Sequence, residues 1–373
     1  MVFTVQTSSA HLGKGILKRT VGHLSLYDAT LAELGTWFTD RGAAPDRARD
    51  VWHWVYRDCD ESLLGLPLGL RRALREDMPL IHPTLIKTQE SPDGHTRKDL
   101  LGMPDGDQVE TVLLRYRQRY TVCVSTQVGC ACGCRFCATG QMGFVRDLTA
   151  GEIIAQVHHF QRLLSEHHHE LSNIVLMGMG EPLLNEEQTI RAVERFVDPR
   201  AFAFAPRRIT LSTVGIPPGI VRLADLHRRL PIKLAVSLHA ATDDTRSSLM
   251  PINRRYPLDI LFEALRYYVE TTGRRVFMEW LMIDGVNDTV SQAQALAKRL
   301  AGLAAHINLI RLNPTPIFEG RPSRPQAVED FVAILDRHGI PHTMRQRRGI
   351  DIKAGCGQLK ANYPNQGADD DQC

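Results

Sequence analysis

The strongest constraint on the fold is a regular alternation of apolar and amphipathic segments through the last two-thirds of the chain. Short apolar segments alternate there with longer stretches that have helical spacing. Such a series predicts an α/β fold, in which a parallel sheet with outer helices curls into a full or partial barrel. The expected strands lie within 121–126, 173–178, 207–213, 232–239, 276–283, 306–313 and 341–346, and the expected helices at about 149–165, 187–197, 219–229, 258–271, 289–302 and 325–338.

Unusual residues gather where these expected strands end. In a parallel barrel the active site lies at the carboxyl ends of the strands, so we expect these residues to share one site. They are the cysteine-rich stretch after the first strand, Gly178-Met179-Gly180-Glu181-Pro182, Ser212-Thr213, Ser237-Leu238-His239, Glu279 and Asn313-Pro314.

The segments before residue 121 have other patterns. Three stretches within 23–80 have helical spacing and predict a small helical accessory domain, and 81–120 alternates as strands with turns and reads as a connector. We expect 1–22 to be an extension, 121–360 to be the barrel core and 361–373 to be a disordered tail.

Composition excludes several classes of protein. The chain has 45 Lys and Arg against 42 Asp and Glu, and the resulting net charge of +3 permits a polyanionic partner only if the basic residues cluster. The first residues have no apolar stretch, and no apolar run reaches ~18 residues, so we expect neither a signal peptide nor a membrane span. Four of the eight cysteines lie within eight residues, which suits a thiolate cluster in a reducing cytoplasm better than a disulfide framework.

The cysteine cluster carries the main chemical signal. Cys130, Cys134 and Cys137 have C-x3-C-x2-C spacing, and three thiolates on one loop can hold three irons of a 4Fe–4S cluster and leave the fourth iron open. Zinc normally takes two separated cysteine pairs, and no second pair is present because Cys356 stands alone. We expect Cys132 to be a bystander. The alternative of a zinc-stabilised RNA-binding protein without catalysis remains open at this point.

The same loop resembles that of the radical S-adenosylmethionine superfamily. Phe136 matches the aromatic residue that is often found before the third cysteine, and Gly178–Pro182 resembles the motif that receives the methionine amino group. The resemblance implies a partial parallel (β/α) barrel of the radical SAM type with a small N-terminal helical domain. It also implies that S-adenosylmethionine binds the open iron and is cleaved on reduction to a 5′-deoxyadenosyl radical.

Longer motifs narrow the resemblance to the RlmN/Cfr-like RNA adenine methyltransferase family. The match runs from the N-terminal helices to about Leu359, and its motifs are CVSTQVGC, CATGQMGF, LMGMGEPLLN, ITLSTVGI, AVSLHA, MPINRRYP and RRGIDIKAGCGQL. It implies methylation of adenosine C2 in the peptidyl transferase region of 23S rRNA and next to the anticodon of tRNA. The alternative is methylation at C8 of 23S rRNA. It further implies two S-adenosylmethionine molecules per turnover and an electron donor such as flavodoxin or ferredoxin.

Three catalytic residues follow from this resemblance. Cys356, in a glycine-flanked loop that we expect to be mobile, would carry the methyl group, and Cys123 would attack its sulfur to release methylated RNA. That attack needs a thiolate, so nearby charge should lower the pKa of Cys123. Glu110 would accept the ring proton; without the resemblance it reads as a solvent-facing strand residue.

The remaining expectations concern the two substrates. Arg115, Arg117 and Arg119 alternate on one expected strand and would share a face, either to contact RNA phosphates or simply as a solvated surface. S-adenosylmethionine would take hydroxyl, carboxylate and amide partners from successive strand ends. By resemblance these are Gly180, Glu181, Ser212, Ser237, Leu238, His239 and Asn313.

Overall fold

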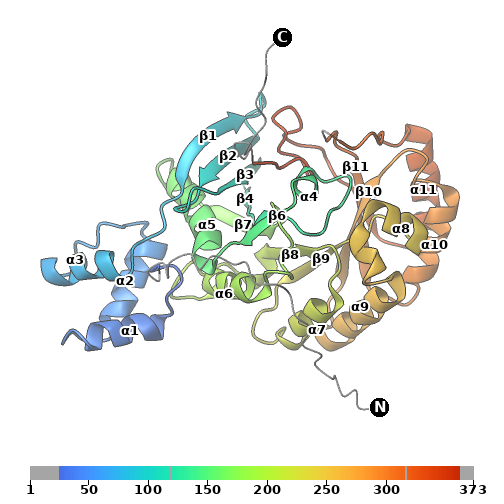
Figure 1. Cartoon of the computed structure of the whole chain (residues 1–373). Helices are drawn as coiled ribbons and strands as arrows, with labels where there is room; N and C mark the ends of the chain where they lie inside the picture. Colours follow the sequence, from blue (N-terminus) through green and yellow to red (C-terminus); the bar gives the residue numbers. More distant parts are fainter. Residues whose placement is uncertain (1–24, 118, 316, 362–373) are drawn as a thin grey trace, which may run out of the picture.

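A computed structural model of the chain describes residues 25–117, 119–315 and 317–361. Figure 1 shows a helical unit, drawn in blue, beside a long curved sheet that carries helices along its outer face. The expected N-terminal extension and the expected disordered tail lie outside the described residues, apart from Ala361. Within the described ranges, no helix is long and apolar enough to cross a membrane.

The main sheet has ten strands in the order β1-β2-β3-β4-β7-β8-β9-β10-β11-β12. The first four strands pair antiparallel, and every pairing from β4 to β12 is parallel. The expected connector between the helices and the barrel therefore extends the same sheet. The strands are β1 (Thr84–Glu90), β2 (Thr96–Gly102), β3 (Gln108–Tyr116), β4 (Arg119–Cys123), β7 (Leu171–Leu176), β8 (Ile209–Thr213), β9 (Lys233–Ser237), β10 (Val276–Met282), β11 (Ala305–Arg311) and β12 (His342–Met344).

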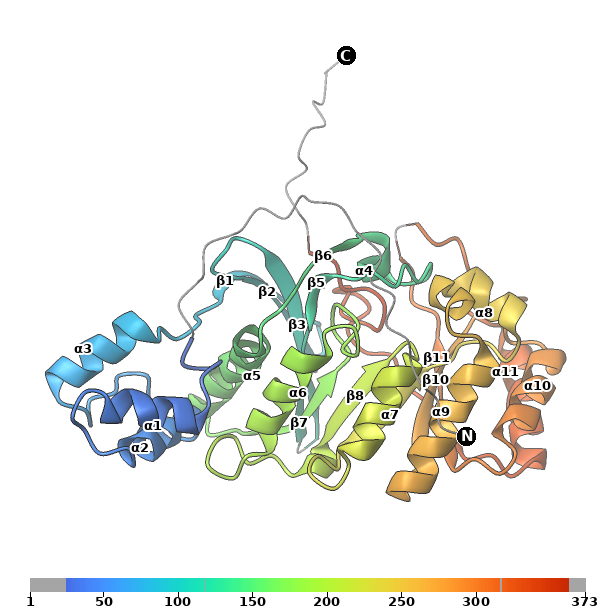
Figure 2. The ribbon, with the colours of Figure 1, turned by 60° about the horizontal axis from the view of Figure 1, so that its bottom comes forward.

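The parallel strands are buried because helices cover their outer face. Short apolar runs such as Leu234–Val236 on β9 are inaccessible to solvent, as expected for strands that lie between two layers. Figure 2 shows the covering helices side by side along the outside of the curve, so the predicted partial barrel is confirmed. These helices are α5 (Ala150–Ser165), α6 (Glu186–Val197), α7 (Pro217–Asp225), α9 (Leu258–Thr272), α10 (Val290–Leu300) and α11 (Pro325–Arg337).

The helical unit consists of α1 (Leu31–Thr39), α2 (Arg47–Tyr56) and α3 (Leu68–Asp77). Thr30 begins α1 with a capping box, in which its hydroxyl accepts a hydrogen bond from the Glu33 amide at 3.1 Å. The buried Arg195 of α6 joins the unit to the barrel. Its guanidinium donates to the Tyr56 hydroxyl at 2.7 Å and stacks 3.8 Å above the Trp52 ring.

Several elements differ from the sequence-based expectation. β3 ends at Tyr116 and β4 begins at Arg119, so the prediction that Arg115, Arg117 and Arg119 share one strand face is wrong. The hairpin carries no glycine that would have marked its turn. The sequence analysis also missed β5 (Gln127–Gly129), α4 (Ala138–Gln141), β6 (Phe144–Asp147), the 3-10 helix Pro206–Arg208, α8 (Asp243–Leu249) and the 3-10 helix Pro251–Arg254.

Candidate active site

A cavity of ≈ 200 Å³ opens at the carboxyl ends of the parallel strands. The cysteine-rich loop forms part of its wall, and the segment that carries Cys356 forms another part. The cavity therefore brings together chain segments that are far apart in the sequence. Glu110, Leu238 and Asn313 do not line the cavity. The expected site residues that line it are Cys123, Cys130, Cys134, Cys137, Gly180, Glu181, Ser212, Ser237, His239 and Cys356.

A larger cleft of ≈ 710 Å³ lies between the helical unit and α6. Several of its charged side chains already have partners, such as Arg200 with Asp198 at 2.9 Å and Arg49 with Asp46 at 3.6 Å. Among the described residues, its walls contain no cysteine and no histidine. The smaller cavity is therefore the candidate for chemistry despite its size.

The cysteine loop is shaped by its glycines. Gly129 has a φ of +74°, and a Cβ added there would lie 2.0 Å from the Gly143 carbonyl oxygen. That close approach lets the Cys130 amide donate to the same oxygen at 2.7 Å and closes the loop at its base. Cys137 then begins the short helix α4. The local sequence thus turns the three spaced cysteines toward one cavity.

Cys132 is buried but does not line the cavity. Its thiol donates a hydrogen bond to the Cys130 sulfur, which lowers the pKa of Cys130 and raises that of Cys132. Cys134 and Cys137 have raised pKa values because they are buried. The geometry therefore places Cys130, Cys134 and Cys137 together at the cavity and leaves Cys132 outside it.

The residues of the cavity fit a 4Fe–4S cluster. Three thiols of the cysteine loop line it, and the fourth cysteine of that loop, Cys132, does not. In the described part of the chain, no three His, Cys, Asp or Glu side chains are grouped closely enough to hold one metal ion. A cubane separates its ligand sulfurs more widely than a single zinc ion does, so this donor set suits the cluster and gives the zinc alternative no site among these residues.

Gly178 and Gly180 form a tight floor beside the cysteines. A Cβ at Gly178 would lie 2.6 Å from the Val124 carbonyl oxygen, and one at Gly180, where φ is +101°, would lie 2.6 Å from the Gln127 side chain. Both positions therefore need glycine. The resulting turn presents the following residue, Glu181, to the cavity.

Glu181 is 2% exposed and has a strongly perturbed acidity. Burial raises the pKa of its carboxyl to about 7, against hydrogen bonds from the Val214 amide, the Thr213 side chain and the Leu183 amide. The amide bonds measure 2.7 Å from Val214 and 3.0 Å from Leu183. A cationic ligand group in the cavity would favour the ionised carboxylate.

Hydroxyl and imidazole groups complete this side of the cavity. Ser212 lies one residue before the end of β8, Ser237 ends β9, and both line the cavity. His239 accepts the Leu281 amide on Nδ1 at 2.9 Å and stands edge-on to Phe136 at 4.8 Å. Burial, followed by the charge of Arg246, lowers the pKa of His239 to about 3, so its ring is neutral. Leu238 does not line the cavity: its side chain is buried in the hydrophobic core, and its carbonyl accepts a hydrogen bond from Arg246 at 3.1 Å.

Cys123 and Cys356 both line the cavity, and their pKa values are raised. Burial and the Cys356 sulfur raise the pKa of Cys123 to about 12, and Arg345 opposes that rise. Cys356 is exposed by its surface area, yet loss of solvation around its sulfur raises the pKa of Cys356 as well, again opposed by Arg345. The predicted lowering of the Cys123 pKa is therefore wrong, because loss of solvation outweighs the nearby guanidinium.

The Cys356 loop has more anchors than its glycines suggest. The Ala138 amide donates to the Gly357 carbonyl at 2.7 Å, and the Thr139 hydroxyl donates to the Leu359 carbonyl at 2.7 Å. Asn313 was expected to contact S-adenosylmethionine, but its amide nitrogen donates to the Cys356 carbonyl at 3.1 Å. These bonds hold the loop to the cysteine helix on one side and to the end of β11 on the other.

Glu110 is buried on β3, so its interpretation as a solvent-facing strand residue is wrong. Its carboxylate is 2.8 Å from the Lys98 ammonium and accepts the Lys360 amide at 2.8 Å. Burial raises the pKa of this carboxyl, against the hydrogen bond and charge of Lys98. Because side chains alternate along a strand, Glu110 shares its face with Val112, which lines the cavity.

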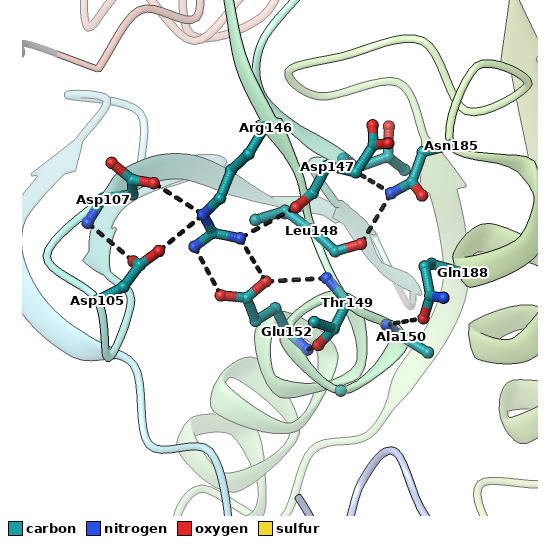
Figure 3. Close-up of polar contacts among 12 residues, drawn as sticks. Asp105, Asp107, Arg146, Asp147, Leu148, Thr149, Ala150, Glu152, Asn185 and Gln188 are labelled. Atoms are coloured by element: carbon teal, nitrogen blue, oxygen red, sulfur yellow. Dashed lines mark hydrogen bonds and ion pairs between the residues drawn. The ribbon is translucent and has the colours of Figure 1, made fainter. Parts of the chain in front are cut away.

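A polar network fixes the chain where it leaves the cysteine loop (Figure 3). Arg146 of β6 binds Glu152 through two hydrogen bonds of 2.8 Å, and it also pairs with Asp105 and Asp107 at 2.7 Å each. The Asn185 side chain donates at 2.8 Å to the Leu148 carbonyl. These contacts tie the loop to the start of α5 and to the β2–β3 turn.

Sequence reasoning did not single out two charged residues of the site, Arg345 and Arg246. Arg345 follows β12, lines the cavity and pairs with Glu279 at 3.3 Å. Arg246 is fully buried and binds the Ser237 carbonyl at 3.2 Å and the Asn253 side chain at 2.9 Å. Position at a strand end could have indicated Arg345. Arg246 lies on a polar helix that gave no apolar periodicity.

Comparison with known proteins agrees with this geometry. Residues 124–296 match the Radical SAM superfamily. The dual-specificity RNA methyltransferase RlmN 1 of Myxococcus xanthus is 51% identical over 340 residues, which cover 90% of this chain and 94% of that protein. A probable dual-specificity RNA methyltransferase RlmN 2 of Opitutus terrae is 46% identical, covering 90% and 86% of the two chains. The crystal structure of a radical SAM methyltransferase from Sphaerobacter thermophilus superposes with a TM-score of 0.88 at 48% identity, covering 91% of this chain and 100% of that one.

Proposed function

Because the chain belongs to the RlmN family of dual-specificity RNA methyltransferases within the radical SAM superfamily, we propose that it methylates C2 of adenosine in 23S rRNA and in tRNA. The observation that carries the proposal is the position of two further thiols. Cys123 and Cys356 line the same cavity as the three proposed iron ligands. One cavity can therefore bring a methyl-carrying sulfur, a resolving sulfur and a reductively cleaved sulfonium together.

Cys130, Cys134 and Cys137 would hold the 4Fe–4S cluster. Gly180, Glu181, Ser212, Ser237 and His239 would surround S-adenosylmethionine. Leu238 and Asn313 would act indirectly. The Leu238 carbonyl binds Arg246, and the Asn313 side chain binds the backbone of the Cys356 loop. When bound, the cluster supplies the electron that cleaves S-adenosylmethionine, and the carbon radical so formed takes one hydrogen atom from a methyl group on Cys356.

Cys356 first receives that methyl group from one S-adenosylmethionine, and a second molecule is cleaved in each turnover. After the methylene carbon joins the adenine ring, the ring regains aromaticity by losing one proton and one electron, and the oxidised cluster would accept that electron. Glu110 is the proposed acceptor of the proton. Its raised pKa supports this role, because a carboxyl that titrates nearer neutral pH holds a proton more readily.

Cys123 then attacks the Cys356 sulfur. The new S–S bond displaces the carbon, which keeps the electron pair of the broken S–C bond, takes up a proton and becomes the methyl group. Two electrons from a donor such as flavodoxin or ferredoxin restore the two thiols. Arg345 supports the attack because its charge opposes the raised pKa of both cysteines.

An arginine and tyrosine surface near Cys356 supports RNA as the substrate. Arg348 follows Arg345 toward the Cys356 loop and stacks 4.5 Å above the Tyr116 ring, and it also donates to the Arg115 carbonyl at 3.1 Å. Arg119 lies 5.7 Å from the same ring. The exposed guanidinium of Arg119 and the half-buried one of Arg348, beside the half-buried Tyr116 ring, suit phosphate contacts and base stacking.

Nucleoside analysis tests the proposal. The cluster-loaded protein is incubated anaerobically with 23S rRNA fragments or tRNA, S-adenosylmethionine and a reductant, and digested RNA is analysed by mass spectrometry. We expect 2-methyladenosine in both RNAs. A product that contains 8-methyladenosine without 2-methyladenosine would instead establish the C8 alternative.

Two variants test the separate roles proposed for the Cys123 and Cys356 thiols. Cys123→Ala should accumulate a covalent RNA–protein adduct, because the link to Cys356 can form but cannot be resolved. Cys356→Ala should form no adduct and no methylated base. Free, unmodified RNA from both variants would contradict the roles assigned to the two cysteines.

A further inference from the structure

Lys98 of β2 is buried beside the site and makes two contacts that no catalytic assignment uses. Its ammonium nitrogen is 2.8 Å from Glu110 Oε1 and donates to the Lys353 carbonyl at 3.1 Å. The other carboxylate oxygen of Glu110 accepts the Lys360 amide at 2.8 Å. Lys353 and Lys360 flank the segment that carries Cys356. The ion pair therefore grips both ends of the Cys356 loop.

We propose that Lys98 is a positioning residue that links the charge on Glu110 to the placement of the Cys356 loop. The inference rests on the proposed function, in which Glu110 takes the ring proton and Cys356 carries the methyl group. While Glu110 is ionised, Lys98 and Glu110 hold the loop together. When Glu110 takes up a proton, the ion pair loses its charge and the grip on the loop weakens.

The link between Glu110 and the Cys356 loop fits the order of the proposed reaction steps. The methyl carbon on Cys356 must stay in place until it joins the base, and the Cys356 sulfur must then become accessible to Cys123. Proton transfer from the ring to Glu110 occurs between these two events. The ionised carboxylate of Glu110 would hold the loop during the first event, and its protonation would loosen the loop before the second. No other conformational trigger would then be needed.

The charges around Glu110 are consistent with such a response. Burial raises its pKa, and the opposing charges come from Lys98, in direct contact, and from the exposed Lys87 of β1. Lys87 makes none of the loop contacts described above. It is therefore a matched control, because its removal changes the charge near Glu110 and leaves the grip on the loop intact.

Hydrogen exchange of the full-length, cluster-loaded protein without RNA tests the proposal. Lys98→Met should raise the exchange of amides 353–360 roughly tenfold or more, the loss expected when a charged hydrogen bond is removed. Lys98→Arg should restore most of the protection, and Lys87→Met should leave it unchanged. Equal exchange in Lys98→Met and the wild type would overturn the proposal.

The pH dependence separates this link from a purely structural role. After correction for intrinsic exchange, protection of the Lys360 amide in the wild type should fall as pH decreases through the pKa of Glu110. Glu110→Gln should show weak protection that does not vary with pH. A wild-type protection that is independent of pH would refute the link, and this measurement decides the question even if Lys98→Met fails to fold.

Turnover supplies a second readout. Lys98→Met should lower kcat for RNA methylation and leave KM for RNA unchanged, because Lys98 does not face the RNA surface; a change confined to KM would contradict the role. Failure of the proposed function is distinguished by the wild type, which would then yield no 2-methyladenosine. The exchange experiment would still establish or refute the grip on the loop.

Discussion

Replacing Glu181 by Gln should abolish a proton release that accompanies S-adenosylmethionine binding. The pKa of about 7 means that the carboxyl is about 0.9 protonated at pH 6 and about 0.1 protonated at pH 8. If the carboxylate receives the ammonium group of S-adenosylmethionine, binding requires its ionised form. The wild type should therefore release close to one proton per ligand at pH 6 and almost none at pH 8.

Anaerobic calorimetry of the cluster-loaded protein, in two buffers with different ionisation enthalpies, measures this release. Glu181→Gln should release no proton at either pH and should bind at least about tenfold more weakly, since a charge-assisted hydrogen bond is lost. Ser212→Ala is the matched control because Ser212 lines the same cavity and does not titrate in this range. It should weaken binding and keep the proton release. Identical release from the wild type and Glu181→Gln would refute the assignment.

The same group predicts a pH dependence of stability, with a definite sign. The folded-state pKa of Glu181 is raised above the usual value of 4.5, so its contribution to stability is fully present below that value and is lost as pH rises through about 7. The difference corresponds to about 3 kcal/mol. In denaturant unfolding without S-adenosylmethionine, Glu181→Gln should gain stability relative to the wild type as pH rises from 5 to 8. A constant difference would contradict the burial argument.

Four further substitutions test the surroundings of the site. Cys134→Ala should lose most of the cluster iron and Cys132→Ala should keep it, as measured by iron content after anaerobic reconstitution; the reverse result would exchange their roles. Gly180→Ala should cost about 1–3 kcal/mol of stability and weaken S-adenosylmethionine binding, because its φ is +101° and the added Cβ would lie 2.6 Å from a neighbouring side chain. Arg146→Gln should lower the free energy of unfolding by about 1.5–3 kcal/mol in denaturant titrations, because it leaves the buried Glu152 without its charged partner.

The sequence predicted the parallel strands and outer helices because burial alone specifies them. Apolar runs such as 276–283 and the amphipathic stretches between them carry the whole signal. The polar helix α8 carries no such signal, since it is held by Arg246 and Asn253 rather than by an apolar face. The hairpin between β3 and β4 was missed for a related reason, because its turn lacks the residues that mark most two-residue turns.

The sequence predicted those site residues whose spacing along the chain, or position at a strand end, indicates their role. The three spaced cysteines and most of the strand-end residues line one cavity, as expected for a parallel barrel, but Leu238 and Asn313 do not. Burial and partners could not be read from spacing. Glu110 depends on Lys98, which lies on the neighbouring strand, and Asn313 binds the backbone of a loop that comes much later in the chain. Such contacts exist only after the strands have paired.

The raised pKa of Cys123 changes how the resolving step must be controlled. With its pKa raised to about 12, Cys123 is almost entirely the neutral thiol near neutral pH, so it is a weak nucleophile in the empty cavity. A lowered pKa would have kept Cys123 ionised throughout the cycle, including the stages before the Cys356 sulfur carries the adenine-linked carbon that the attack displaces. In the proposed cycle, the resolving thiol must therefore be activated after RNA has bound, when Arg345 or a charged group brought by the substrate can stabilise the thiolate. In the proposed cycle, the loss of solvation at Cys123 would thus keep the two sulfur reactions in order.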